Sequence, residues 1–140
     1  AGMLLGKKRG PIAVVVYIAV GLAGAPVFSM GGGIGYVFKP TFGYMLGFVL
    51  AAFVAGAVAG RGKAGFLRLL AGGGLGVAAI YMLGMTYWFL LARYYMRAPL
   101  AVAYVLRYGM LPFIPGDLLS CALAALLARR LRPALTRPDA

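Results

Sequence analysis

The stretch PTFGYMLGFVLAAFVAGAVAG, residues 40–60, contains no charged side chain and is followed directly by Arg61. A helix needs about 20 mainly apolar residues to cross a membrane. Other uncharged stretches lie at residues 10–38 and 69–92, and a fourth at 108–128 is interrupted only by Asp117. We therefore predict an all-α membrane protein, a polytopic helical bundle forming a single transmembrane domain over residues 1–140. Its four spans are expected at about residues 11–28, 42–60, 69–92 and 115–131. The apolar segment 98–106 is too short to span and is expected to be interfacial or re-entrant.

The composition supports the membrane interpretation. Hydrophobic residues make up 64% of the chain and charged residues 11%, against about 45–50% and about 25% in typical soluble domains. The sequence has no histidine, and Cys121 is its one cysteine. These counts exclude a His/Cys metal cluster, an internal disulfide and a catalytic triad centred on histidine. We expect no metal, no cofactor and no enzymatic activity.

The net charge of +12 reflects 14 Lys and Arg residues against two acids. The basic residues flank the apolar stretches, a pattern typical of helix ends at lipid headgroups rather than of a nucleic-acid-binding surface. With four spans, ten cations fall on one side of the bilayer: Lys7, Lys8, Arg9, Arg61, Lys63, Arg68, Arg129, Arg130, Arg132 and Arg137. The other side has four: Lys39, Arg93, Arg97 and Arg107. The positive-inside rule then predicts a cytoplasmic C-terminus.

A glycine-rich segment, GGGIGYVFKPTFGY at residues 31–44, separates the first two predicted spans. It fits neither phosphate-binding fingerprint, because Tyr36 and Phe38 stand where glycine is required and no Gly-Lys-Ser/Thr follows. We expect a non-helical segment on the external side. Two interpretations remain open: a loop with an aromatic belt at the headgroups, or the wall of a pocket whose backbone N–H and C=O groups meet a polar ligand.

Asp117 is the one acid near any predicted span. Following Pro115, it suits the first turn of a helix, where the helix dipole favours a negative charge. A carboxylate at membrane depth is also costly, which favours a functional role with Arg93, Arg97, Arg107 or a ligand's N–H groups as its partner. Ser120 follows on the same helix face, and Tyr81 and Trp88 are placed to line a pocket facing Asp117.

Small residues recur along the second predicted span in two stripes: Gly43, Gly47, Ala51, Ala55 and Ala59, and Ala52, Gly56 and Gly60. Such stripes let helix backbones approach closely in lipid. They are expected either to pack inside the bundle or to dock another membrane subunit.

Three segments together resemble a known family: LLGKKRG, YIAVGLAGAPVFSMGGGIGYVFKPTFGYMLGF and LPFIPGDLLSCALAALLARRL. Their ordered combination is similar to the BioY-type biotin transporters, the substrate-capture (S) components of energy-coupling-factor (ECF) transporters. The family fold has six membrane helices, so the four predicted spans correspond to its last four. We expect the first helix and most of the second to be absent from this sequence. Relative to the family pattern, Lys39 and Phe42 replace glycines and Ser120 replaces a lysine.

The resemblance implies high-affinity binding and uptake of biotin across the cytoplasmic membrane of a bacterial or archaeal cell. It implies as partners a transmembrane coupling subunit and two ATPase subunits, with no nucleic acid. The implied ligand site contains Asp117, which accepts hydrogen bonds from the ureido group, and seven further residues: Gly32, Gly33, Tyr36, Thr41, Tyr44, Trp88 and Ser120. The alternatives are an S component for a different vitamin, or a membrane packing subunit without its own ligand.

Overall fold

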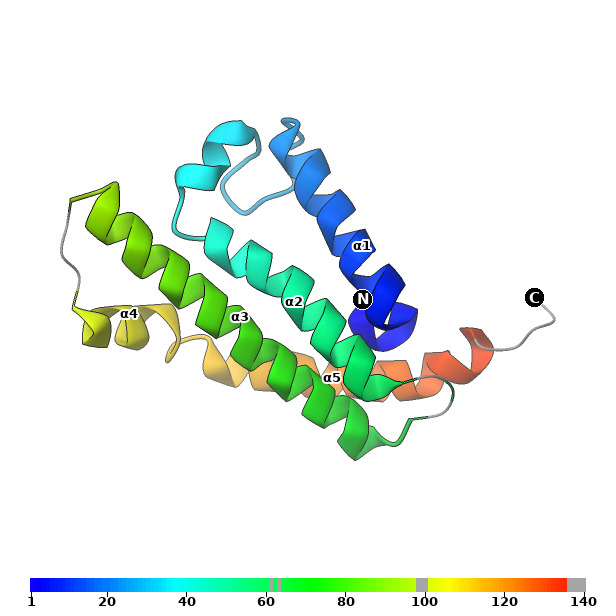
Figure 1. The fold of residues 1–140 in the computed structure, drawn as a ribbon. Coiled ribbons are helices and arrows are strands. Elements are labelled where there is room, and N and C mark those ends of the chain that lie inside the picture. Colours follow the sequence, from blue (N-terminus) through cyan, green and yellow to red (C-terminus); the bar gives the residue numbers. More distant parts are fainter. Residues whose placement is uncertain (61, 63, 98–100, 136–140) are drawn as a thin grey trace.

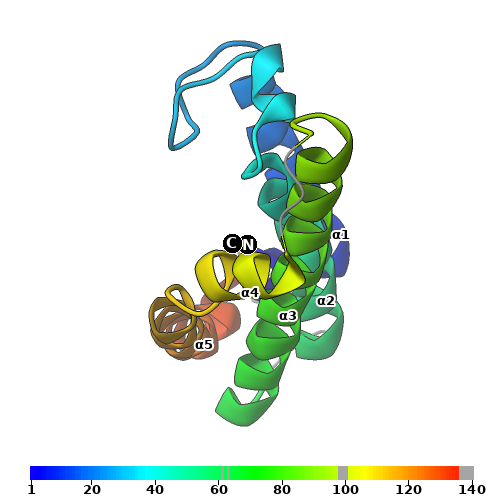
Figure 2. The ribbon, with the colours of Figure 1, turned by 90° about the vertical axis from the view of Figure 1, so that its left-hand side faces the viewer.

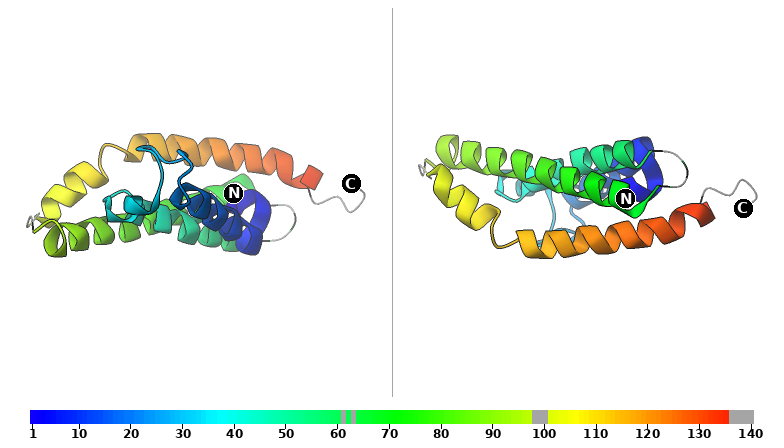
Figure 3. Two further views of the ribbon diagram at one scale, coloured as in Figure 1. Left: turned by 90° about the horizontal axis from the view of Figure 1, so that it is seen from above. Right: turned by 90° about the horizontal axis from the view of Figure 1, so that it is seen from below.

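The computed structural model describes residues 1–60, 62, 64–97 and 101–135. Helices α1 (Gly2–Leu22) and α3 (Phe66–Tyr94) lie on either side of α2 (Phe42–Ala59), as Figure 1 shows. Helix α5 (Ile114–Leu135) runs along one face of these three helices (Figures 2 and 3) and is preceded by the short α4 (Val102–Gly109). The described residues contain helices and no strand, which confirms the predicted all-α class.

The long helices follow the predicted hydropathy pattern. Helix α2 ends one residue before the predicted limit of residue 60, and α3 and α5 extend a few residues beyond residues 69–92 and 115–131. Among the described residues, α2 and α3 are long and apolar enough to cross a membrane. The pair α4 and α5, bent by 49°, adds one further candidate as a broken span or a re-entrant loop. Of the segment expected to be interfacial or re-entrant, residues 98–100 lie outside the described part of the chain, as do the cations Arg61, Lys63 and Arg137.

Helix α1 differs from the predicted first span at both ends. It starts at Gly2, where a span from residue 11 was expected, and it ends at Leu22 rather than near residue 28. Gly24 adopts a φ of +113° and Pro26 follows, so the chain leaves the helix there. A kink at Gly6, with φ of 79°, lies near the start of the helix. The basic cluster Lys7–Arg9 lies inside α1, and this 21-residue helix, although long enough, is not among the described helices that are apolar enough to cross a membrane.

Both stripes of small residues on α2 are used inside the bundle. A Cβ on Gly47 would lie 2.7 Å from Cα of Ile80 on α3. On the opposite side of α2, a Cβ on Gly56 would lie 2.5 Å from the backbone nitrogen of Lys7 on α1. In lipid the hydrophobic effect does not drive helices together. The close approach of the backbones instead stabilises the helix pairs through van der Waals contacts. The structure therefore supports the internal-packing interpretation of the stripes.

Two arginines secure the C-terminal end of α2. Arg132 on α5, which is 6% exposed, donates hydrogen bonds to the carbonyls of Ala59 and Gly60 at 3.1 and 2.5 Å. Arg68 donates from Nε to the carbonyl of Val58 at 2.6 Å. The last carbonyls of a helix have no hydrogen-bond partner within the helix, and they carry the negative end of its dipole. The two arginines therefore supply the missing donors and place positive charge at that end.

Candidate ligand-binding site

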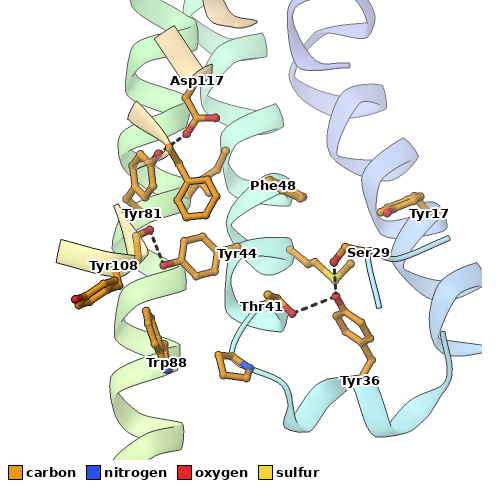
Figure 4. Close-up of a pocket in the computed structure, with 15 residues that line it drawn as sticks. Tyr17, Ser29, Tyr36, Thr41, Tyr44, Phe48, Tyr81, Trp88, Tyr108 and Asp117 are labelled. Carbon is orange, nitrogen blue, oxygen red and sulfur yellow. Dashed lines mark hydrogen bonds between the residues drawn. The ribbon is translucent and has the colours of Figure 1, made fainter. Parts of the chain in front are cut away.

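A cavity of about 570 Å³ opens between α2, α3, the α4–α5 junction and the glycine-rich segment. Its walls are mainly aromatic and aliphatic, with a few hydroxyl groups and one carboxylate (Figure 4). This size, and apolar walls with few polar groups, are typical of small-molecule sites. The lining residues are Tyr17, Ser29, Tyr36, Pro40, Thr41, Tyr44, Met45, Phe48, Ile80, Tyr81, Trp88, Tyr108, Gly109, Phe113 and Asp117.

Asp117 is the carboxylate of this wall, and it lies in the first turn of α5. Its Oδ2 accepts a hydrogen bond from the hydroxyl of Tyr81 on α3. The arginines expected as its partners do not take that role: in the described part of the chain, no ion pair joins Asp117 to Arg93, Arg97 or Arg107. Arg93 lies in the last turn of α3, beyond the cavity-lining Trp88, and the other two do not line the cavity.

Tyr44 fixes one side of the cavity. Its hydroxyl donates to the carbonyl of Gly109, at the end of α4, over 3.0 Å. Its ring fits against α3 at Gly84, where a Cβ would lie 2.5 Å from the ring. The ring also meets that of Tyr81 edge to face, with centroids 6.5 Å apart. A single residue of α2 thus connects α3 to the α4–α5 junction.

The glycine-rich segment contributes a second polar part of the wall. The hydroxyl of Tyr36 accepts a hydrogen bond from Thr41 at 3.1 Å and lies 3.2 Å from Oγ of Ser29 (Figure 4). The segment was expected to be non-helical, but residues Ile34–Phe38 form a 3-10 helix, η1. Gly33, with φ of 103°, starts this helix, and its carbonyl accepts a bond from the Tyr36 N–H. The Tyr36 ring is consequently buried, with 3% exposure.

Five of the eight residues implied by the family resemblance line the cavity: Tyr36, Thr41, Tyr44, Trp88 and Asp117. Gly32 and Gly33 do not. The N–H of Gly33 donates to the carbonyl of Gly21 at 2.7 Å, and a Cβ on Gly32 would lie 2.1 Å from the carbonyl oxygen of Ala25. These glycines therefore pack the chain closely against the end of α1. Ser120 is exposed and lies outside the cavity.

Several lining residues were not among those implied by the resemblance. Tyr81 and Trp88, on the same predicted helix, were expected to line a pocket facing Asp117. Both of these aromatic residues line the cavity. Tyr108 and Phe113 reach the cavity because α4 bends by 49° into α5. Hydropathy carries no signal for that bend. Phe48 follows Tyr44 at helical spacing, a weak signal that was available in the sequence.

Two departures from the family pattern have structural roles beside the cavity. Phe42 is buried in a cluster with Ile18, Phe28, Tyr36 and Met45. Lys39 donates to the carbonyl of Met30 at 3.3 Å, and its ammonium lies 5.0 Å from the centre of the Tyr36 ring. Neither side chain lines the cavity.

The sequence has the pattern of a known family over nearly its whole length. The sequence model that describes the BioY family matches residues 1–137. This chain belongs to the BioY family. A biotin transporter BioY of Thermotoga maritima is 40% identical over 130 residues, covering 92% of this chain and 72% of the relative. A probable biotin transporter BioY of Pyrococcus horikoshii is 38% identical over 133 residues, covering 94% and 74%.

A similar fold has been solved by crystallography. The S-component for biotin from an ECF-type ABC transporter superposes with a TM-score of 0.78 at 25% identity, covering 94% of this chain and 69% of that one. A probable biotin transporter BioY of Lysinibacillus sphaericus is 36% identical over 132 residues, and the matched region covers 67% of it. Together with the apolar helices, membership of the BioY family makes the chain a multi-pass membrane protein of a transporter family.

Proposed function

We propose that the protein captures biotin at the outer face of the cell membrane, as the substrate-specific subunit of an ECF-type transporter. The names of the BioY relatives and the likeness to a biotin S-component support the ligand and the transport role. The observation that carries the proposal is the position of Asp117, the carboxylate in the wall of a mainly apolar cavity.

The chemistry of the cavity suits this ligand. A ureido group offers two N–H donors, and hydrogen bonds to an ionised acceptor are roughly twice as strong as neutral ones. Asp117 would accept those donors, while aromatic walls including Trp88 and Phe113 would cover the apolar ring. Tyr36, Thr41 and Tyr44 would enclose the rest of the molecule. This assignment leaves Gly32 and Gly33 out of the ligand contacts, because neither lines the cavity.

The protein would have a defined orientation in the membrane and would depend on partner subunits for the energy of transport. The four predicted spans would carry the chain through the bilayer with the C-terminus in the cytoplasm, following the ten-to-four charge count derived from the sequence. The protein would act as a binding subunit without catalysis of its own. A transmembrane coupling subunit and two ATPases would supply the transport energy, because the sequence contains no phosphate-binding motif.

Equilibrium titration of the purified protein with labelled biotin, riboflavin and thiamine tests the proposal. We expect saturable binding of biotin alone. Asp117→Asn is expected to weaken biotin binding by roughly 10-fold to 100-fold, the value of a hydrogen bond to a charged group. Thr86→Val is the matched control, because Thr86 is exposed on α3 and bonds only its own helix at Met82.

The outcomes separate the alternatives. Saturable binding of riboflavin or thiamine in place of biotin indicates an S component for another vitamin. Absence of binding of all three supports a packing subunit without a ligand. Unchanged biotin affinity in Asp117→Asn removes this carboxylate from the site.

A further inference from the structure

The hydrogen bond between Tyr81 and Asp117 joins two helices at the cavity wall. Tyr81 lies on α3 and Asp117 follows 36 residues later, in the first turn of α5. We propose that Tyr81 is a positioning residue, whose hydroxyl holds the Asp117 carboxylate in the orientation that receives the ligand's N–H donors. This inference rests on the proposed function, and it adds a residue that acts on the ligand through Asp117.

The Tyr81 hydroxyl has little freedom to move. The side chain is 5% exposed, and its ring meets Tyr44 edge to face at an interplanar angle of 89°. Tyr44 is itself held between Gly84 and the carbonyl of Gly109. Because packing holds the Tyr81 ring in place, its hydroxyl can determine the orientation of the Asp117 carboxylate. A mobile hydroxyl would instead follow the carboxylate.

The carboxylate, in contrast, has rotational freedom of its own. The terminal torsion of aspartate has broad, roughly two-fold preferences, so the carboxyl plane is set by its hydrogen-bond partners. A carboxylate offers about four lone-pair sites. The Tyr81 bond occupies one of them, on Oδ2. It thereby fixes the plane of the group and leaves Oδ1 available to donors in the cavity.

The same bond stabilises the charge. A carboxylate in an apolar wall is costly unless it is hydrogen-bonded. In the described residues no cation forms an ion pair with Asp117, and the side-chain bond that it accepts comes from Tyr81. A hydroxyl donor can stabilise the negative charge without neutralising it. An ion-paired arginine would compete more strongly with the ligand for the same oxygens.

A double-mutant cycle on biotin affinity tests the inference. We expect Tyr81→Phe to weaken biotin binding by roughly 10-fold, because a donor to a charged group is lost. In an Asp117→Ala background, which has no side-chain acceptor for the Tyr81 hydroxyl, the same substitution should change the affinity by less than about 2-fold, because residues that act as a unit are not additive. A purely structural role of Tyr81 would give the same factor in both backgrounds.

Tyr87→Phe is the matched control for this cycle. Tyr87 also lies on α3 and also donates its hydroxyl to an oxygen, the carbonyl of Val37, but it does not line the cavity. Its effect on affinity should be equal in the two backgrounds. The unfolding temperatures of the ligand-free variants form a second cycle, in which Tyr81 and Asp117 should be coupled and Tyr87 and Asp117 should not.

The outcomes separate the positioning role of Tyr81 from the proposed binding of biotin. Biotin binding by the wild type, with equal losses from Tyr81→Phe in both backgrounds, overturns the positioning role alone. Where Asp117→Ala binds too weakly to measure, additive changes in unfolding temperature for Tyr81→Phe and Asp117→Ala overturn it as well. A wild-type protein that does not bind biotin overturns the proposed function together with this inference.

Discussion

Phe42 and Lys39 stand where the family pattern has glycine, and the structure gives them unequal importance. Phe42 is 9% exposed and packs against the buried ring of Tyr36 and its neighbours. We expect Phe42→Ala to lower the free energy of unfolding by about 3 kcal/mol, because it leaves a cavity in this cluster. Lys39→Gln should lower the free energy of unfolding by less than about 1 kcal/mol, since it removes one cation–π contact and one exposed hydrogen bond. Chemical unfolding in detergent compares the two.

Equal effects of these two substitutions would contradict the burial argument. A large loss in Lys39→Gln alone would mean that the lysine, rather than the phenylalanine, holds η1 in place. Biotin affinity should fall in Phe42→Ala only to the extent that Tyr36 moves, because Phe42 does not line the cavity.

Asp117 could be predicted as a residue of the candidate site from the sequence. Asp117 is the one acid near an apolar stretch, so its cost in a membrane identifies it from the sequence alone. Tyr81 was expected in a pocket facing Asp117, but its hydrogen bond to the carboxylate was not predicted, because local sequence does not show which hydroxyl on one helix reaches a group on another. The contact of Tyr44 with Gly109 joins residues 65 positions apart, and no local pattern encodes it.

At the scale of helices, α2 depends on its small residues. A Cβ at Gly47 would lie 2.7 Å from the backbone of Ile80, so α2 and α3 would have to separate. We expect Gly47→Ala to lower the free energy of unfolding by about 1–3 kcal/mol through overpacking. Gly74→Ala is the control, because nothing lies within 4 Å of its Cβ position, and it should be neutral or slightly stabilising. Thermal unfolding in detergent measures both.

A Gly47→Ala protein as stable as the wild type would show that the α2–α3 contact adapts easily. A loss of stability in Gly74→Ala would place an unforeseen contact on the outer face of α3. The cavity should also respond to Gly47→Ala, because Ile80 is one of its lining residues.

The limits of α2, α3 and α5 could be predicted to within a few residues and those of α1 could not, again for physical reasons. Long apolar runs dominate the choice of structure in α2 and α3, so their limits follow hydropathy. The end of α1 at Leu22 depends instead on Gly24 and Pro26, which lie inside an uncharged stretch that hydropathy treats as uniform. The kink at Gly6 accompanies the close approach of Gly56, and such a contact between distant residues has no local signal.

At the scale of the whole molecule, three of the described cations, with hydrogen bonds to carbonyls, lie at the two ends of α2. Arg68 and Arg132 bind carbonyls at its C-terminal end, whereas Lys39 precedes its N-terminal end and bonds Met30. The positive-inside rule assigns the first end to the cytoplasm. Cysteine labelling with a membrane-impermeant maleimide tests this assignment in a Cys121→Ala background. We expect Met30→Cys to react in intact cells and Leu135→Cys to react only after permeabilisation.

The two reporter positions are matched in accessibility, because Met30 is 65% exposed and Leu135 is 63% exposed. A difference in labelling therefore reflects the side of the membrane rather than local burial. Cys121 is buried against Gly73, so its removal lowers background labelling, and replacing its small side chain by alanine should disturb the packing little. The reverse labelling pattern would place Met30, the neighbour of the cavity-lining Ser29, in the cytoplasm, and the proposed capture of a ligand from outside would then fail. Labelling of both positions in intact cells would place Met30 and Leu135 on the same side of the membrane, which would contradict the proposed arrangement of four spans.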